Sequence, residues 1–282
     1  MPKISRRGFI KSAMAMTAAP LLANTHESED KNSLKFIHIT DSHMDLEDQD
    51  SVEAMELMVT FINAEYKDLD FVLFGGDNFN NNAPGNTDAL RFKKIIDGLH
   101  CPSYLVRGNK ESSPKPQDDS QNLDDFKTMF FDANKIHVHG KDWLLSTKGY
   151  NILGLDSCVE HANNGVYTDE TLAFAQKVLE KGAPTIVLNH HPYTNYWKGT
   201  EAKDIHKYVL NNTDAVQKRL FTYSNLILTL SGHKHIDSVT KINGTKAIVT
   251  RGFIRPLDLD MYPMRYVEIN GSKIDEKLIY TA

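Results

Sequence analysis

Short apolar runs alternate along the chain with segments whose apolar residues recur at helical spacing. Apolar or β-branched runs predict buried strands at residues 34–40, 71–74, 104–106, 151–155, 185–188 and 226–230. Apolar side chains three and four positions apart predict amphipathic helices at residues 52–66, 87–99, 123–131, 169–181 and 204–221. The last helix is expected to break at residues 211–213. This alternation predicts an α/β fold.

The pattern changes after residue 231 to strands joined by turns. Strands are predicted at residues 239–242, 246–249, 265–269 and 274–280, and Asn243-Gly244 has the composition of a hairpin turn. We therefore expect an antiparallel tail. Because no repeat, low-complexity segment or long linker divides the sequence, residues 31–282 are expected to form one domain behind a leader of residues 1–30.

The leader has the features of an export signal. Residues 5–11 read Ser-Arg-Arg-Gly-Phe-Ile-Lys, which resembles a twin-arginine (Tat) signal, and an uncharged stretch at residues 12–22 follows it. That stretch is too short to span a bilayer, which needs about 20 apolar residues. We expect export by the Tat translocase, a periplasmic or secreted mature protein, and no stable membrane anchor.

Composition and charge narrow the possible functions. The chain of 282 residues is 40% hydrophobic and 24% charged, which excludes a disordered chain and a multi-span membrane protein. Without the first 23 residues it has 28 basic and 37 acidic residues, a formal charge of −9. So acidic a chain is not expected to bind nucleic acid. The two cysteines, Cys101 and Cys158, form no CxxC motif.

Metal-ligating residue types stand at the ends of five predicted strands. These ends are Asp41-Ser-His43, Gly76-Asp77-Asn78, Gly108-Asn109, Asn189-His190-His191-Pro192 and Gly232-His233-Lys-His235. Ligands of open α/β sheets collect at the carboxyl ends of strands, and residues two apart in an extended segment point to the same side. Carboxylate, amide and imidazole groups suit divalent ions such as Mn, Fe or Zn. The pattern predicts a shared metal site.

Taken in order, these motifs resemble those of the calcineurin-like metallophosphoesterase superfamily, over about residues 34–270. The resemblance is closest to its cyclic-nucleotide phosphodiesterase and glycerophosphodiesterase branch, on residues 39–43, residues 155–157 with 165–170, and His190-His191-Pro192. It implies a four-layer α/β/β/α sandwich of two mixed sheets flanked by helices. It also implies a metal-dependent phosphoesterase of small phosphate esters.

The resemblance implies a centre of two divalent metal ions. One ion would be held by Asp41, His43 and His235, the other by Asn109, His190 and His233, and Asp77 would bridge them. Ions so bridged are typically about 3.5–4 Å apart, and a hydroxide between them would attack phosphorus.

One position departs from the family pattern, because Lys110 stands where the family has a histidine that assists the leaving group. Three interpretations of this replacement remain open. Lys110 serves in the same role, or His191 or a water delivers the proton, or catalysis is weak or lost and the chain is a metal-containing binding or regulatory protein. Asn78 and Arg251 are further candidates for contacts with substrate. A nuclease is disfavoured by the acidic charge.

Overall fold

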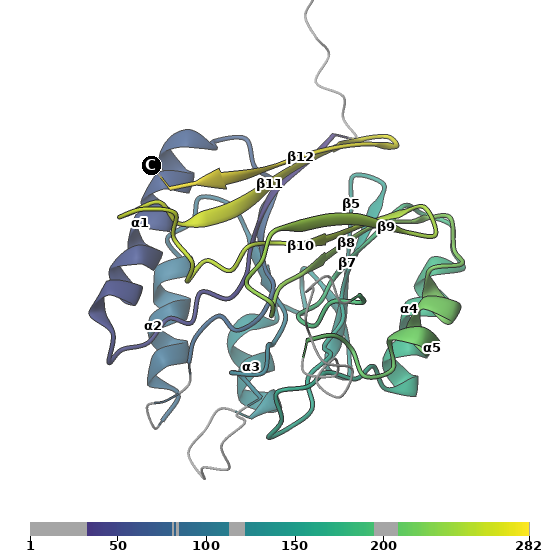
Figure 1. Ribbon diagram of the computed structural model, residues 1–282, viewed down its shortest axis with the longest axis horizontal. Coiled ribbons are helices and arrows are strands. Elements are labelled where there is room, and N and C mark those ends of the chain that lie inside the picture. The colour runs from purple at the N-terminus through teal and green to yellow at the C-terminus, as the bar shows by residue number, and fades with distance from the viewer. Residues whose placement is uncertain (1–32, 81, 83–84, 113–121, 195–207, 282) are drawn as a thin grey trace, which may run out of the picture.

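The structure of the chain is a computed structural model that describes residues 33–80, 82, 85–112, 122–194 and 208–281 (Figure 1). The expected leader, residues 1–30, lies outside the described residues. Residues 204–207, the start of the last expected helix, lie outside them as well. Among the described residues, no helix combines the length and the apolar character that crossing a bilayer requires.

Two mixed sheets form the centre of the molecule (Figure 1). The first has the order β12-β11-β1-β2-β3, with the bounds β1 Leu34–Ile39, β2 Phe71–Phe74, β3 Ser103–Leu105, β11 Pro263–Asn270 and β12 Lys273–Tyr280. In this sheet β1, β2 and β3 run parallel, whereas β11 is antiparallel to β1. The carboxyl ends of three parallel strands therefore share one edge.

The second sheet has the order β4-β5-β6-β7-β8-β10-β9. The bounds are β4 His137–His139, β5 Asp142–Thr147, β6 Tyr150–Gly154, β7 Thr185–Leu188, β8 Leu226–Ser231, β9 Ser238–Ile242 and β10 Thr245–Val249. Strands β6, β7, β8 and β10 are parallel. Their carboxyl ends form a second edge from which loops can supply ligands.

Helices cover the outer face of each sheet, as Figure 1 shows. The first sheet carries α1 Gln49–Glu65, α2 Thr87–Ile96 and α3 Leu123–Phe130, and the second carries α4 Asp169–Leu179 and α5 Thr213–Leu220. The side chains of Asn122 and Thr168 cap α3 and α4 by accepting a backbone N–H of the first turn.

Alternation along the central strands fills the layers on both sides. In β1, Phe36 packs in the apolar cluster between the sheets, while its neighbour Ile37 packs in the cluster under α1, α2 and α3. Strand β2 repeats this pattern with Phe71 and Val72, as side chains in a strand point alternately to opposite faces. A third cluster lies under α4 and α5. The expected four-layer α/β/β/α sandwich is thus confirmed.

The structure corrects two expectations about the strands. The tail is not wholly antiparallel, because β10 pairs in parallel with β8, and β11 and β12 cross to the first sheet. The Asn243-Gly244 turn specifies only the β9–β10 pair, and the partner on the other side of β10 is nonlocal. Strand β5 was not predicted, since the sequence DWLLST has only a short apolar run.

The strand ends also bend differently from the extended segments that the sequence predicts. Five candidate ligands have positive φ angles: Asp41 (56°), His43 (47°), Asp77 (51°), His233 (67°) and His235 (54°). The left-handed region costs a residue other than glycine about 1–2 kcal/mol. The pairs Asp41/His43 and His233/His235 are therefore aimed by strained turns, and the reason given for their convergence was wrong.

We predict that Trp143→Phe destabilises the protein by about 1–3 kcal/mol. The buried indole of Trp143 in β5 donates its N–H to the carbonyl of Leu105 in β3, at 2.7 Å, and so joins the two sheets. Phenylalanine keeps most of the apolar volume but leaves this carbonyl without its donor. Urea denaturation followed by circular dichroism measures the change, and an unchanged free energy of unfolding would contradict it.

Candidate metal centre

Asp41, His43 and His235 form the first half of the candidate centre. They follow β1 and β8, which belong to different sheets. Nε2 of His43 lies 3.2 Å from Nε2 of His235, and Nε2 of His235 lies 3.3 Å from Oδ1 of Asp41. Three potential ligand atoms therefore face a common point, with Asp41 and His43 buried and His235 partly exposed.

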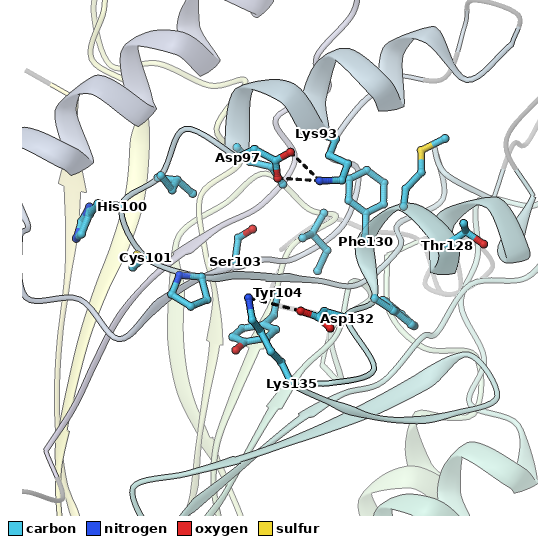
Figure 2. A pocket seen from close by; sticks show the side chains of 16 residues that line it. Lys93, Asp97, His100, Cys101, Ser103, Tyr104, Thr128, Phe130, Asp132 and Lys135 are labelled. Carbon is cyan, nitrogen blue, oxygen red and sulfur yellow. Dashed lines mark hydrogen bonds and ion pairs between the residues drawn. The ribbon is translucent and has the colours of Figure 1, made fainter.

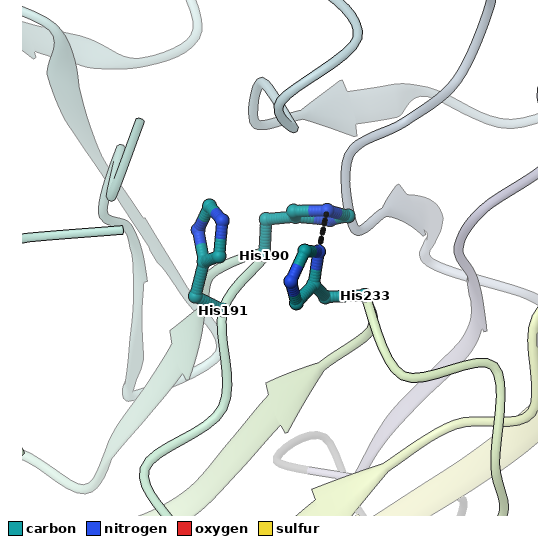
Figure 3. A group of neighbouring side chains, drawn as sticks. All are labelled: His190, His191 and His233. Atoms are coloured by element: carbon teal, nitrogen blue, oxygen red, sulfur yellow. Dashed lines mark hydrogen bonds between the residues drawn. The ribbon is translucent and has the colours of Figure 1, made fainter. Parts of the chain in front are cut away.

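Asn109, His190 and His233 form the second half. Oδ1 of Asn109 lies 3.2 Å from Nε2 of His190 and 3.0 Å from Nδ1 of His233, and these two nitrogens are 3.2 Å apart. Figure 3 shows the rings of His190 and His233 turned toward each other. These residues follow β3, β7 and β8, so this half also draws on both sheets.

Asp77 stands between the two halves. Its Oδ2 lies 3.6 Å from Nε2 of His43, and its Oδ1 lies 3.5 Å from Nε2 of His190. One carboxylate oxygen thus faces each half, which is the arrangement of a bridging ligand. The structure brings all seven predicted ligands together, in the grouping that the sequence resemblance implies.

The electrostatics of the cluster favour positive charge. Burial opposes ionisation of Asp77, but His190 and His43 outweigh it and hold the pKa of Asp77 well below its usual value. Burial likewise opposes protonation of His190, yet Asp77 and Asp41 raise the pKa of His190 to about 9. The two buried carboxylates therefore make this a place where positive charge is stabilised.

A buried glutamate fixes the backbone of this region. The Glu111 carboxylate accepts the backbone N–H groups of Asp77 (3.0 Å), Asn78 (2.6 Å) and Gly108 (2.7 Å). Burial and the nearby charge of Asp77 raise the pKa of Glu111 to about 7. The loop after β2 is thereby tied to the loop after β3, and a Cβ on Gly108 would lie 2.2 Å from the nitrogen of Asp77.

His191 lies beside the centre, with its ring next to His233 (Figure 3). Its Nδ1 is 2.8 Å from the hydroxyl of Ser157, and its Nε2 is 3.1 Å from the carbonyl of Asn163. Burial and the neighbouring His233 place the pKa of His191 well below its usual value. Both ring nitrogens are thus engaged inside the protein.

The remaining predicted residues surround the cluster. Lys110 is half-buried, its backbone N–H donates to Oδ1 of Asp77, and its ammonium forms no ion pair with any residue that the structure describes. Buried Asn78 donates its amide to the carbonyl of Val106. Arg251 is half-buried, and its Nε donates a hydrogen bond to the carbonyl of Arg255.

Sequence reasoning missed the groups that orient the imidazoles. Nδ1 of His190 lies 2.9 Å from the carbonyl of Gly75, and Nδ1 of His43 lies 3.1 Å from Oδ1 of Asn80. The polar run at residues 80–82 could have indicated an orienting partner for a histidine, but such a run is equally typical of a turn.

The donor set fits divalent transition-series ions. Two carboxylates, one amide and four imidazoles converge, and such oxygen and nitrogen ligands suit Mn, Fe and Zn. The ligand atoms of His190, His191 and His233 also lie close enough to one another to share an ion. A hollow of about 560 Å³ lies at the outer edge of β3, near the ends of α2 and α3 (Figure 2). Its lysines pair with neighbouring aspartates, Lys93 with Asp97 and Lys135 with Asp132, and no candidate ligand lines it.

Known proteins resemble the chain in sequence and in fold. A "Probable glycerophosphodiester phosphodiesterase GpdQ" of Arcobacter nitrofigilis is 24% identical over 176 residues, which cover 62% of this chain and 59% of that relative's length. A dimetal phosphatase from Danio rerio superposes with a TM-score of 0.61 at 14% identity, covering 88% of this chain and 99% of the other. The purple acid phosphatase PPD1 of yellow lupin has a TM-score of 0.59 at 13% identity, covering 88% and 52%.

The sequence pattern of one family matches most of the chain. The profile described as calcineurin-like phosphoesterase matches residues 34–237, a range that holds all seven candidate ligands. Because the match covers well over half of the chain and the ligands converge as the motifs require, the chain belongs to the calcineurin-like phosphoesterase family.

Proposed function

We propose that the chain is a metal-dependent phosphoesterase that hydrolyses small phosphate esters at a centre of two divalent ions. The position of Asp77 carries this proposal, since its two carboxylate oxygens face separate groups of three ligands. Family membership supports the reaction class, and the phosphatase folds among the similar structures are consistent with it.

The protein's part in the reaction is to hold and orient charge. Asp41, His43 and His235 would hold one ion, and Asn109, His190 and His233 the other. Bound there, two divalent ions supply Lewis-acid polarisation of the phosphoryl group and activation of water. Glu111 keeps Asp77 and Gly108 in register, so that the ligands are in place before substrate arrives.

Lys110 and Arg251 are the proposed contacts with substrate. Lys110 follows the ligand Asn109 directly, and its ammonium can donate to phosphoryl oxygens. Arg251 precedes Gly252, where a Cβ would lie 3.0 Å from the ring of His235, so the backbone next to Arg251 lies near the first half of the centre. Asn78 follows Asp77 directly, and its Oδ1 is buried without a partner among the described residues.

We propose small phosphodiesters as the preferred substrates and phosphomonoesters as the alternative. The 24% identity to a probable glycerophosphodiester phosphodiesterase favours diesters, and the branch-specific motifs at residues 155–157 and 190–192 agree. Mn, Fe and Zn all suit the ligands. Residues 5–22 support export by the Tat translocase to the periplasm or beyond, with a metal-loaded, folded protein as cargo.

A second candidate function is a metal-containing binding or regulatory protein. Two observations favour this function. Lys110 replaces the family histidine, and both ring nitrogens of His191 are hydrogen-bonded inside the protein, so neither is set up as the acid for the leaving group. A chain that binds two ions yet turns over no ester would support this function instead.

We predict that Asp77→Asn lowers metal-dependent phosphodiesterase activity by at least about 100-fold, since losing the bridging charge weakens both ion sites. The assay uses the full chain with Mn²⁺ and a bis-aryl phosphodiester, an aryl monoester and a cyclic nucleotide. Asp97→Asn, an exposed partner of Lys93 remote from the cluster, is the matched control and should keep full activity. Equal activity in the two variants would contradict the assignment.

We predict that Lys110→His raises the rate on alkyl phosphodiesters by about 10-fold or more, with a smaller gain on aryl esters. A positioned acid contributes about 10²–10⁴-fold, and most where the leaving group is poor. Steady-state kinetics on one alkyl and one aryl ester measures the ratio. If the variant is slower on both, Lys110 is adapted to its own task rather than an impaired substitute.

A further inference from the structure

A series of three hydrogen-bonded side chains starts at the candidate ligand His43. Nδ1 of His43 lies 3.1 Å from Oδ1 of Asn80, and Nδ2 of Asn80 donates to Oδ2 of Asp45 at 2.9 Å. Asp45 is buried and Asn80 is half-buried. The sequence offered no metal or catalytic motif at either position.

Backbone hydrogen bonds between the segments that follow β1 and β2 hold these three side chains next to one another. The N–H of Met44 donates to the carbonyl of Asn78 at 3.1 Å, and the N–H of Asn80 donates to the carbonyl of Met44 at 2.9 Å. The side chains of Met44 and Phe79 are fully buried at this bridge. Asn80 is therefore set beside His43 and Asp45 by the same parallel pairing that aligns the strands.

The Asp45 carboxylate fixes which way the Asn80 amide points. Oδ1 of Asp45 accepts the N–H of Glu47 at 2.9 Å, and Oδ2 accepts both Asn80 and Nδ2 of Asn82, the latter at 2.8 Å. A carboxylate surrounded by donors acts only as an acceptor, so the NH₂ group of Asn80 must face it. The carbonyl oxygen of Asn80 is then left to face His43.

This orientation decides the tautomer of His43. Because an amide oxygen can only accept, Nδ1 of His43 must carry the proton and donate it. Nε2 is then the nitrogen with a free lone pair, and it is the atom that lies 3.2 Å from Nε2 of His235. The wrong tautomer would turn an N–H toward the ion.

In the other half of the centre, His190 is oriented by the main chain instead. Nδ1 of His190 faces the carbonyl of Gly75 at 2.9 Å, and a side-chain substitution cannot remove a main-chain carbonyl. The two halves should therefore respond differently to mutation.

We propose that Asp45 and Asn80 are positioning residues that set the tautomer of His43 and thereby retain the ion of the Asp41–His43–His235 half, but not the ion of the other half. The inference rests on the proposed two-ion centre. Orienting partners of metal-bound histidines typically contribute about 10–100-fold to metal affinity.

Asn82 provides a matched control. It donates to the same oxygen of Asp45 as Asn80 does, but no contact between Asn82 and His43 is found in the described part of the chain. The experiment compares the full-length wild type, Asn80→Ala, Asp45→Asn and Asn82→Ala after loading with Mn²⁺. Ions per chain are counted by elemental analysis, and affinities are measured by calorimetric titration with Mn²⁺.

We expect two ions in the wild type and in Asn82→Ala. In Asn80→Ala one ion should stay at wild-type affinity while the other binds about 10–100-fold more weakly, and Asp45→Asn should weaken the same ion. Long-range ¹H–¹⁵N NMR of the EDTA-treated protein should show the Nδ1–H tautomer of His43 in the wild type and a tautomer mixture in Asn80→Ala. A purely structural role would leave that spectrum unchanged.

The inference is overturned if Asn80→Ala keeps two ions at unchanged affinity, if both ions weaken equally, or if Asn82→Ala behaves like Asn80→Ala. Ion counts do not depend on turnover. A wild type that holds two ions and hydrolyses no ester would contradict the proposed function, while the comparison of Asn80→Ala with Asn82→Ala would still decide this inference.

Discussion

The buried carboxylate of Glu111 is the interaction on which the site depends. It gathers the backbone N–H groups of Asp77, Asn78 and Gly108, which lie after two parallel strands of the first sheet. Without that acceptor these amides would be buried without partners, and each such group costs about 1–3 kcal/mol. The position of Asp77, the proposed bridging carboxylate, is therefore set by backbone hydrogen bonds.

The centre exists only because two sheets pack against each other. The first sheet supplies Asp41, His43, Asp77 and Asn109, and the second supplies the histidines after β7 and β8. The N–H of His233 donates to both oxygens of Asp41 at 3.0 Å, so the two contributions are joined directly. Apolar packing between the sheets thus aligns ligands whose mutual charges alone would not bring them together.

Strain and burial are concentrated at this edge. Five of the seven candidate ligands have left-handed φ angles, and the carboxylates of Asp41 and Asp77 are removed from water. Strained conformations persist only where the surrounding structure determines them, and they cluster at functional sites. Burial of the three apolar clusters stabilises the fold and offsets the conformational strain at this edge. Lys110 adds a cation beside the cluster, which distinguishes this chain from the family pattern.

Apolar periodicity predicted the alternating strands and helices, and the motif after each strand supplied the candidate ligand types, because both signals are local. The four-layer sandwich was implied only by the resemblance to the family. The sequence also identified the departure at Lys110. It could not show that β10 pairs in parallel with β8, that Asp41 and His43 lie in left-handed turns, or that Asn80 orients His43. These features arise from contacts between residues far apart in the chain, and only the packed tertiary structure decides them, since no local pattern encodes a nonlocal partner.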